Sequence, residues 1–171
     1  MHRLAGPGWM PTTAYYKCRY EILRRPLGFE SGAEILEDDV DAIHAYVEID
    51  HEVVAVGRSH LIPEDSDGAQ TDFPDQSGPK TPPFSHLDEN HRPAIQIRQM
   101  GTLEAHRRQG YACKILNALE EASKAEFGAV CGFLQARERA IPFYLSQGWV
   151  LIDEPYSIPN VGPHRSMMKQ F

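Results

Sequence analysis

The six residues from Arg107 to Ala112, Arg-Arg-Gln-Gly-Tyr-Ala, have the types and spacing of a loop that binds a pyrophosphate. The first N–H groups of a helix have no partner inside the helix, and the helix dipole adds partial positive charge there. Gly110 lets a bulky anion approach the backbone, and Arg107 and Arg108 supply cationic donors suited to phosphate oxygens. Taken alone, the same six residues are equally compatible with an ordinary surface turn.

The segments on both sides of this loop favour the order strand, anion-binding loop and helix. Residues 94–100 alternate apolar and polar side chains with the period of a strand. After the loop, apolar side chains recur at helical spacing at Ile115, Leu116, Leu119 and Ala122, and Gly128 is typical of a helix C-terminus. This order would aim the N-terminus of a helix at an anion.

Further elements are predicted towards the N-terminus. Thr12 or Thr13 can cap a helix that runs to about Arg25. Residues 43–49 and 53–62 alternate in hydrophobicity around a short turn, which predicts a β-hairpin.

Two stretches rich in glycine and proline interrupt this pattern. Residues 1–11 are predicted to form a loose N-terminal arm. Residues 63–93 are dense in Pro, Asp, Gly and Ser, too polar to bury a core, and predict a long insertion loop between two strands. A disordered excursion is favoured for this insertion over a substrate lid or a subunit contact. The whole chain, residues 1–171, is predicted to be a single domain.

Composition argues against several classes of protein. The formal net charge of −7 opposes nucleic-acid binding and weakly favours cationic amines as ligands. Three widely spaced cysteines indicate neither a disulfide framework nor a metal site. We find no signal peptide and no apolar run of membrane-spanning length. The expectation is a cytoplasmic protein that uses no metal and binds no membrane.

The loop and a later segment together resemble the GNAT superfamily of acyl-CoA-dependent N-acyltransferases. Its motif Gln/Arg-x-x-Gly-x-Gly/Ala is matched by Arg107, Gly110 and Ala112. Its next motif is commonly Asn-x-x-Ala-x-x-Phe-Tyr followed by a Gly-aromatic pair, and Arg137 stands here in place of the asparagine. The other positions of that motif are matched by Ala140, Phe143, Tyr144, Gly148 and Trp149.

Two more pieces are similar to one branch of this superfamily. They are Arg98-Gln99-Met100 ahead of the loop and Pro163-His164-x-x-Met167-x-Lys169 near the C-terminus. The likeness covers most of residues 12–171 and is strongest from 94 to 149.

The resemblance implies an α/β (α+β) domain of the GNAT fold, with a central mixed, mostly antiparallel sheet flanked by helices and splayed at the cofactor site. It implies transfer of an acetyl group from acetyl-CoA to a primary amine of a small-molecule or peptide acceptor, by direct attack in a ternary complex. The oligomeric state stays open, with a homodimer among the options. The alternative is a CoA-binding regulatory or interaction module that has lost catalysis.

The same resemblance assigns the residues that bind acetyl-CoA. The backbone of Met100, Gly101 and Thr102 would pair with the pantetheine arm, although close packing alone also explains Gly101. Cys113 is more easily a packing residue than a covalent acyl carrier. The residues expected to seat the pyrophosphate are Arg107, Arg108, Gln109, Gly110, Tyr111, Ala112 and Cys113.

Tyr144 is the expected general acid, because the tyrosine of this Phe-Tyr pair in the resembling enzymes often protonates the leaving thiolate. Its alternative role is that of an aromatic side chain that fills space.

The general base is harder to assign, because Gln96 and Arg98 on the strand before the loop cannot accept a proton at neutral pH. His164 is favoured, since its Pro-His pair lies where family members bring the last strand beside the acceptor. Arg98 could instead hold a carboxylate of the acceptor, or simply pair with a neighbouring Glu. Besides a bound water, the candidates for the base are His44, Glu48, His60, Glu104 and His164.

Overall fold

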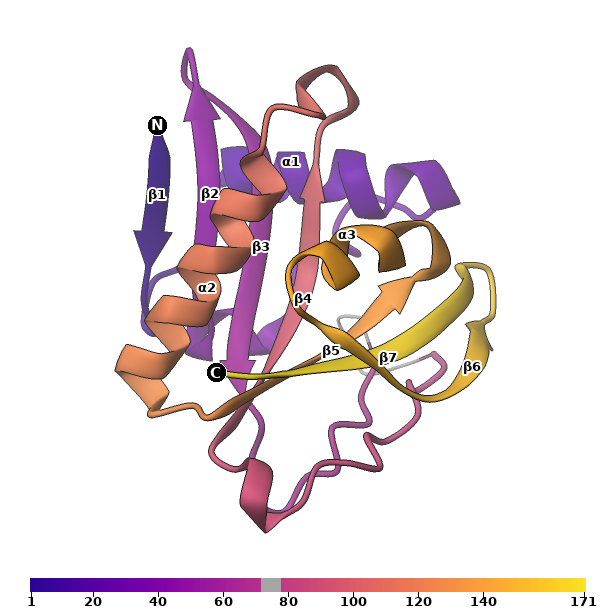
Figure 1. The fold of residues 1–171 in the computed structure, drawn as a ribbon. Coiled ribbons are helices and arrows are strands. Elements are labelled where there is room, and N and C mark those ends of the chain that lie inside the picture. The colour runs from indigo at the N-terminus through magenta and orange to yellow at the C-terminus, as the bar shows by residue number, and fades with distance from the viewer. Residues whose placement is uncertain (72–77) are drawn as a thin grey trace.

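The protein is built around one sheet with helices on both faces (Figure 1). The computed structural model describes residues 1–71 and 78–171. The seven strands have the order β1-β2-β3-β4-β5-β7-β6. β4 and β5 pair in parallel and the other neighbours pair antiparallel, so the predicted mixed, mostly antiparallel sheet is confirmed. The strands are β1 (His2–Ala5), β2 (Ile43–Ile49), β3 (Glu52–Leu61), β4 (Ala94–Thr102), β5 (Cys131–Arg137), β6 (Val150–Ile158) and β7 (Gly162–Gln170).

The helices begin and end close to the predicted residues. The Thr12 hydroxyl accepts a hydrogen bond from the backbone N–H of Tyr15 and caps the first helix, while the second stops at Gly128, whose φ is +63°. The α-helices are α1 (Thr13–Leu23), α2 (Tyr111–Phe127) and α3 (Ile141–Ser146). Short 3₁₀ helices are η1 (Arg25–Leu27), η2 (Glu37–Asp41), η3 (Glu89–His91), η4 (Glu104–His106) and η5 (Glu138–Ala140).

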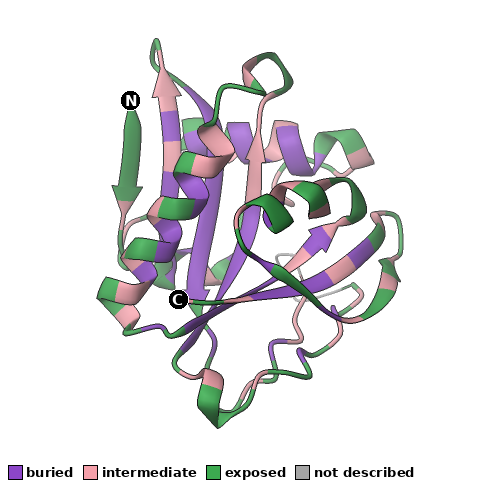
Figure 2. Ribbon diagram, in the orientation of Figure 1, coloured by how far each residue is buried: buried purple, intermediate pink, exposed green. Residues whose placement is uncertain are grey.

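Two apolar layers hold these helices to the sheet. In Figure 1, α2 lies in front of the sheet and α1 behind it, and Figure 2 shows the buried residues concentrated on the strands between them. The first layer joins α2 to the central strands, and the second joins α1 to β3. Representative buried residues are Ile95, Ile97, Ile115 and Leu119 in the first layer, and Tyr15, Cys18, Val53 and Val56 in the second.

The sheet splits between β4 and β5, as the resemblance implies. These strands pair only from Ala94–Gln96 to Cys131–Phe133 within the described chain, while β5 stays paired with β7 as far as Arg137. At Gln99, where φ is +52°, the β3–β4 register shifts in the manner of a β-bulge. The C-terminal half of β4 therefore leaves β5 and borders an opening.

Part of the predicted N-terminal arm is a strand, so the prediction of a loose arm over residues 1–11 is wrong there. β1 pairs with β2, with His2 opposite Val47 and Ala5 opposite His44. The backbone N–H of Gly8 then donates to Val40 O at 2.7 Å. β1 is short and largely exposed, so main-chain pairing to a sheet edge holds it, and such pairing has no hydrophobic signature in the sequence.

The insertion over residues 63–93 also packs against the sheet where the structure describes it. Phe84 is 3% exposed and its ring centroid lies 5.0 Å from that of Phe133 on β5. The Thr81 backbone N–H donates to Gln70 O at 2.9 Å. The expectation of a disordered excursion that buries no core is therefore wrong for residues 63–71 and 78–93, and residues 72–77 lie outside the described chain. One buried aromatic ring and a few paired polar groups hold this segment against the sheet, although its composition is polar.

A buried group of charges ties α1 to the sheet. Asp39 of η2 accepts from Arg19 of α1 and from Arg58 of β3, each at 2.8 Å. Arg58 also pairs with Asp38 at 2.8 Å. Arg19, Arg58 and Asp39 are at most 1% exposed, whereas the Asp38 side chain is 45% exposed.

Asp39→Asn should lower the free energy of unfolding by about 3–5 kcal/mol, because it removes the carboxylate that pairs with buried Arg19 and leaves buried Arg58 with Asp38 alone. Asp38→Asn is the matched control and should cost less, since water reaches Asp38. Urea unfolding of both variants at neutral pH measures the difference, and equal losses would contradict it.

The same carboxylate makes stability depend on pH. Burial raises the pKa of Asp39, but the charge and hydrogen bonds of Arg19 and the charge of Arg58 outweigh burial and hold the pKa below its usual range. Its contribution is therefore complete above the unfolded pKa of about 3.9 and is lost as the pH falls through the folded value.

Candidate active site

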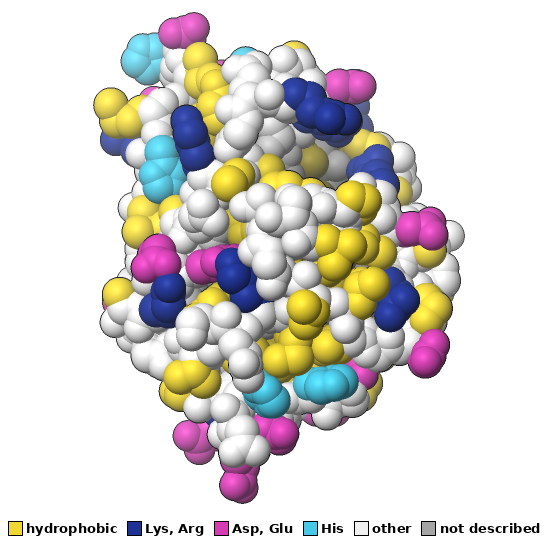
Figure 3. Space-filling model, in the orientation of Figure 1, with side chains coloured by type: hydrophobic (Ala, Val, Ile, Leu, Met, Phe, Trp, Pro, Cys, Tyr) yellow, Lys and Arg dark blue, Asp and Glu magenta, His cyan; other side chains and the backbone are white. Residues whose placement is uncertain are grey.

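A cavity of about 410 Å³ opens where β4 and β5 separate. Its walls come from the end of α1, from α3, from the 63–93 segment and from the turn between β6 and β7. Figure 3 shows a hollow in the upper half of the molecule, with an apolar floor and basic side chains around its rim. The cavity therefore lies at the split that the fold produces.

The predicted pyrophosphate loop lies at the mouth of this cavity. Arg107 and Ala112 line it, while Arg108, Gln109 and Gly110 are exposed beside it. Gly110, with φ +78°, is the N-cap of α2; no side chain caps the helix and no acidic residue occupies its first turn. The first N–H groups of α2 thus face open space, which suits an anion.

Two other predicted residues of this loop lie in the first turn of α2. The Tyr111 hydroxyl donates to Gln109 Oε1 at 2.9 Å. The Cys113 thiol donates to Gln147 Oε1 at 3.1 Å, so it contacts α3's C-terminal end. Neither side chain is among the described residues that line the cavity.

The end of β4 forms one wall of the cavity through Met100, Gly101 and Thr102. Beyond Gln96 this strand has no partner on its β5 side within the described residues, so main-chain groups there remain open to a ligand. A Cβ atom on Gly101 would overlap Cγ2 of Ile22 in α1. Close packing therefore explains this glycine, as the sequence allowed.

Tyr144 of α3 is both a core residue and a cavity residue. Its ring packs edge-on against Phe143 and Trp149, with centroids at 5.1 and 6.2 Å. Its hydroxyl has no hydrogen-bond partner among the described residues, and burial raises the pKa of Tyr144 to about 12. The hydroxyl stays protonated at neutral pH and is free to donate to a ligand.

His164 of β7 also lines the cavity and presents a basic nitrogen. Its Nδ1 lies 2.8 Å from Gly162 O, which can only accept, so Nδ1 carries the proton and Nε2 keeps its lone pair. Burial and the charge of Arg137 lower the pKa of His164, although the Gly162 carbonyl opposes them. The imidazole is therefore neutral at pH 7.

None of the other candidate bases is among the described residues that line the cavity, and three of them have other partners. His44 lies between the Tyr15 hydroxyl at 3.1 Å and Asp39 O at 2.7 Å, and burial lowers its pKa to about 4. His60 Nε2 is 3.1 Å from Gln70 Nε2. Glu48 forms an ion pair with Arg3, and Glu104 is exposed.

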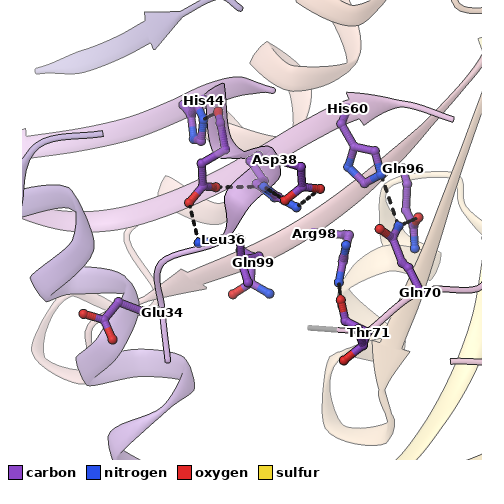
Figure 4. A network of polar contacts seen from close by, with 12 residues as sticks. Glu34, Leu36, Asp38, His44, His60, Gln70, Thr71, Gln96, Arg98 and Gln99 are labelled. Carbon is purple, nitrogen blue, oxygen red and sulfur yellow. Dashed lines mark hydrogen bonds and ion pairs between the residues drawn. The ribbon is translucent and has the colours of Figure 1, made fainter. Parts of the chain in front are cut away.

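The two polar residues of the preceding strand differ in their positions. Gln96 does not line the cavity; its side-chain amide donates to Gln135 Oε1 at 2.6 Å. Arg98 does line it and donates to Thr71 O at 2.9 Å, as Figure 4 shows. Arg98 therefore stays a candidate for contact with a ligand.

The cavity is strongly basic, in contrast to the chain's net charge of −7. No aspartate or glutamate is among the described residues that line it. Arg24 and Arg139 were not singled out in the sequence, because they come from separate elements and show no common motif. The arginines in the lining are Arg24, Arg98, Arg107, Arg137 and Arg139.

Within residues 1–71 and 78–171, no group of three or more His, Cys, Asp or Glu side chains could hold a metal ion. In the same residues no helix has both the length and the apolar character needed to cross a membrane.

Known proteins resemble this chain in sequence. The family model described as the acetyltransferase (GNAT) family matches residues 12–149. The chain is 33% identical over 76 residues to the uncharacterised N-acetyltransferase YitI of Bacillus subtilis, covering 44% of this chain and 50% of YitI. With YjcF of the same organism it shares 34% identity over 74 residues, covering 43% and 52%. The chain thus matches only about half the length of these curated relatives.

Solved structures resemble it over nearly its full length. An acyl-CoA N-acyltransferase from Pseudomonas aeruginosa has a TM-score of 0.65 at 17% identity, covering 99% of this chain and 98% of that one. An aminoglycoside 6'-N-acetyltransferase in complex with coenzyme A has a TM-score of 0.63 at 12% identity, covering 98% and 96%. These likenesses establish the fold, and the family model covers most of the sequence. The chain therefore belongs to the acetyltransferase (GNAT) family.

Proposed function

We propose that this protein transfers an acetyl group from acetyl-CoA to a primary amine by direct attack in a ternary complex. One observation carries the proposal: the uncapped N-terminus of α2, the unpaired edge of β4 and the Tyr144 hydroxyl all border one cavity. Anion binding, docking of an extended arm and proton donation would then occur along one continuous path.

The donor is proposed to bind along the loop and β4. The N–H groups at the start of α2, with Arg107 and Arg108, would hold the pyrophosphate outside the cavity. Backbone groups of Met100 to Thr102 would pair with the pantetheine arm as an added strand does. This arrangement would place the thioester inside the cavity, beside Tyr144.

The chemical steps then follow from the positions of two side chains. His164 Nε2 takes a proton from the ammonium group, and the free amine attacks the thioester carbonyl carbon. A β4 backbone N–H stabilises the oxyanion of the tetrahedral intermediate. When that intermediate collapses, the C–S bond breaks and Tyr144 gives its proton to the departing thiolate, while the acylated nitrogen returns a proton to the Tyr144 oxygen. His164 then releases to water the proton that it took from the ammonium group. The products are the N-acetylated amine and CoA.

Two measurements on the wild-type protein test this proposal. Titration calorimetry should show acetyl-CoA binding, and a broad panel of amines should cause release of free CoA, followed with a thiol reagent. Protein without amine is the control for the protein's own thiols. Acetyl-CoA binding without amine-dependent release would instead indicate a CoA-binding module without catalysis.

The role of His164 predicts a specific change in the pH profile. Its pKa is lowered, so kcat/KM of the wild type should hold at pH 7 and fall with acid only below about 6.5. His164→Gln should reduce kcat/KM by about 10²- to 10⁴-fold and remove this acid limb. His86→Gln, at an exposed site, is the control. An unchanged limb in His164→Gln would assign the base to another group.

A further inference from the structure

Arg137 lies at the end of β5, lines the cavity and has no hydrogen-bond or ion-pair partner among the described residues. Other buried arginines do have such partners: Arg19 and Arg58 pair with carboxylates, and Arg24 donates to Ala33 O at 2.8 Å and to Gln99 Oε1 at 3.2 Å. A half-buried guanidinium has five N–H donors and costs free energy without acceptors. The cavity thus offers a charged donor to a ligand.

The direction of this side chain separates it from the donor site. Side chains alternate along β5, and Leu134 and Ala136 belong to the core that packs on α2. Gln135 lies on the other face, where its amide donates to Thr81 Oγ1 at 3.2 Å, and Phe133 packs there on Phe84. Arg137 shares this face, opposite to the one that α2 covers.

His164, the proposed base, is on the same face as Arg137. The two residues are directly opposite each other in the antiparallel β5–β7 ladder. Directly opposed residues have Cβ atoms about 4.5–5.5 Å apart. The carboxylate-binding and amine-binding groups would therefore be close together, which matches a ligand whose amine and acid groups are close in its own structure.

We propose that the acceptor is an amino acid with an apolar side chain, whose carboxylate pairs with Arg137 while its amine faces His164. This inference rests on the proposed function and names its substrate class. Apolar residues from α1, from the segment after η1, from the end of β6 and from the β6–β7 turn line the cavity and would contact the side chain of the acceptor: Leu23, Phe29, Ile158 and Val161.

The electrostatics of the cavity support an acidic ligand. Burial lowers the pKa of Arg137, and the charges of Arg139 and Arg24 lower it further. An incoming carboxylate would relieve this repulsion, whereas a polyamine or a lysine-rich peptide would add to it. The net negative charge of the chain favours a cationic acceptor, but the charged residues that line the cavity are arginines and favour an acidic one.

Matched acceptors test the inference in the wild-type protein. L-leucine and L-phenylalanine are compared with their amides, as kcat/KM per free amine from CoA release. The acids should be preferred at least ~10-fold, and Arg137→Gln should reduce that preference about 10- to 100-fold, as expected for loss of a charge-assisted pair. Arg137→Lys should restore part of it. Arg3→Gln, which removes one charge from the far edge of the sheet, should leave the preference unchanged.

A binding experiment separates this inference from the proposed function. Calorimetry of N-acetyl-L-phenylalanine with the CoA-loaded protein should show at least ~10-fold weaker binding in Arg137→Gln. The amide of this ligand should bind both proteins alike. Equal turnover of acids and amides overturns the amino-acid assignment and leaves acetyl transfer intact. If Arg137→Gln weakens acetyl-CoA binding and keeps the acid preference, Arg137 belongs to the donor site and the inference is wrong. If no amine releases CoA, the proposed function fails, and the product-binding result still decides the role of Arg137.

Discussion

Gly110→Glu should weaken acetyl-CoA binding at least ~100-fold, equivalent to about 2.7 kcal/mol. A side chain at this position meets no atom of the described residues within 4 Å of its Cβ, so it would project into the open space before α2. The carboxylate would then occupy the anion position at the helix N-terminus and repel the pyrophosphate. Titration calorimetry with acetyl-CoA measures the effect.

Gly128→Glu is the control for this variant. Gly128 caps the other end of the same helix with a φ of +63°, close to the +78° of Gly110, and its Cβ position is equally open. It therefore imposes similar backbone strain far from the loop and should preserve binding. Unchanged affinity in Gly110→Glu would refute the assignment of the loop, and equal losses in both variants would trace the effect to the fold.

Tyr144→Phe should lower kcat by about 10²- to 10⁴-fold while changing acetyl-CoA affinity little. The ring that packs against Phe143 and Trp149 is retained. The hydroxyl makes no hydrogen bond within the described residues, so its removal leaves no buried group unsatisfied. The variant thus removes a proton donor and little else. Single-turnover kinetics, in which chemistry limits the rate, measure the loss.

Tyr15→Phe provides the contrast for this experiment. The Tyr15 hydroxyl donates to Gly57 O at 3.1 Å inside the α1–β3 layer. Its loss should lower the free energy of unfolding and leave the rate of chemistry intact. A Tyr144→Phe enzyme that keeps its wild-type single-turnover rate would show that this tyrosine is a packing residue.

Local signals in the sequence were enough to predict most of the elements. Thr12 and Gly128 mark helix ends through interactions made within a few residues. β1 was missed because its four residues, three of them exposed, depend on the edge of β2, more than 35 residues away. Phe84 was missed for a similar reason. A single aromatic residue in a polar segment forms no repeating hydrophobic pattern that would predict its burial.

More of the proposed donor side than of the proposed acceptor side could be read from the sequence. The loop from Arg107 to Ala112 is a continuous motif, and family resemblance singled out Tyr144 and His164. The cluster of arginines depends on a split in the sheet that brings separate elements together. The net charge of the chain does not reveal this cluster, because the carboxylates elsewhere in the protein outnumber these arginines.

The open side of β4 has a consequence for the stability of the protein in a cell. Beyond Gln96, this strand ends its pairing with β5 and leaves a row of main-chain groups inside the molecule. A ligand that fills this place binds the folded chain and not the unfolded one, which adds about 2.7 kcal/mol of stability at a concentration of 100 Kd. The resistance of the folded protein to proteolysis should then increase with the concentration of acyl-CoA.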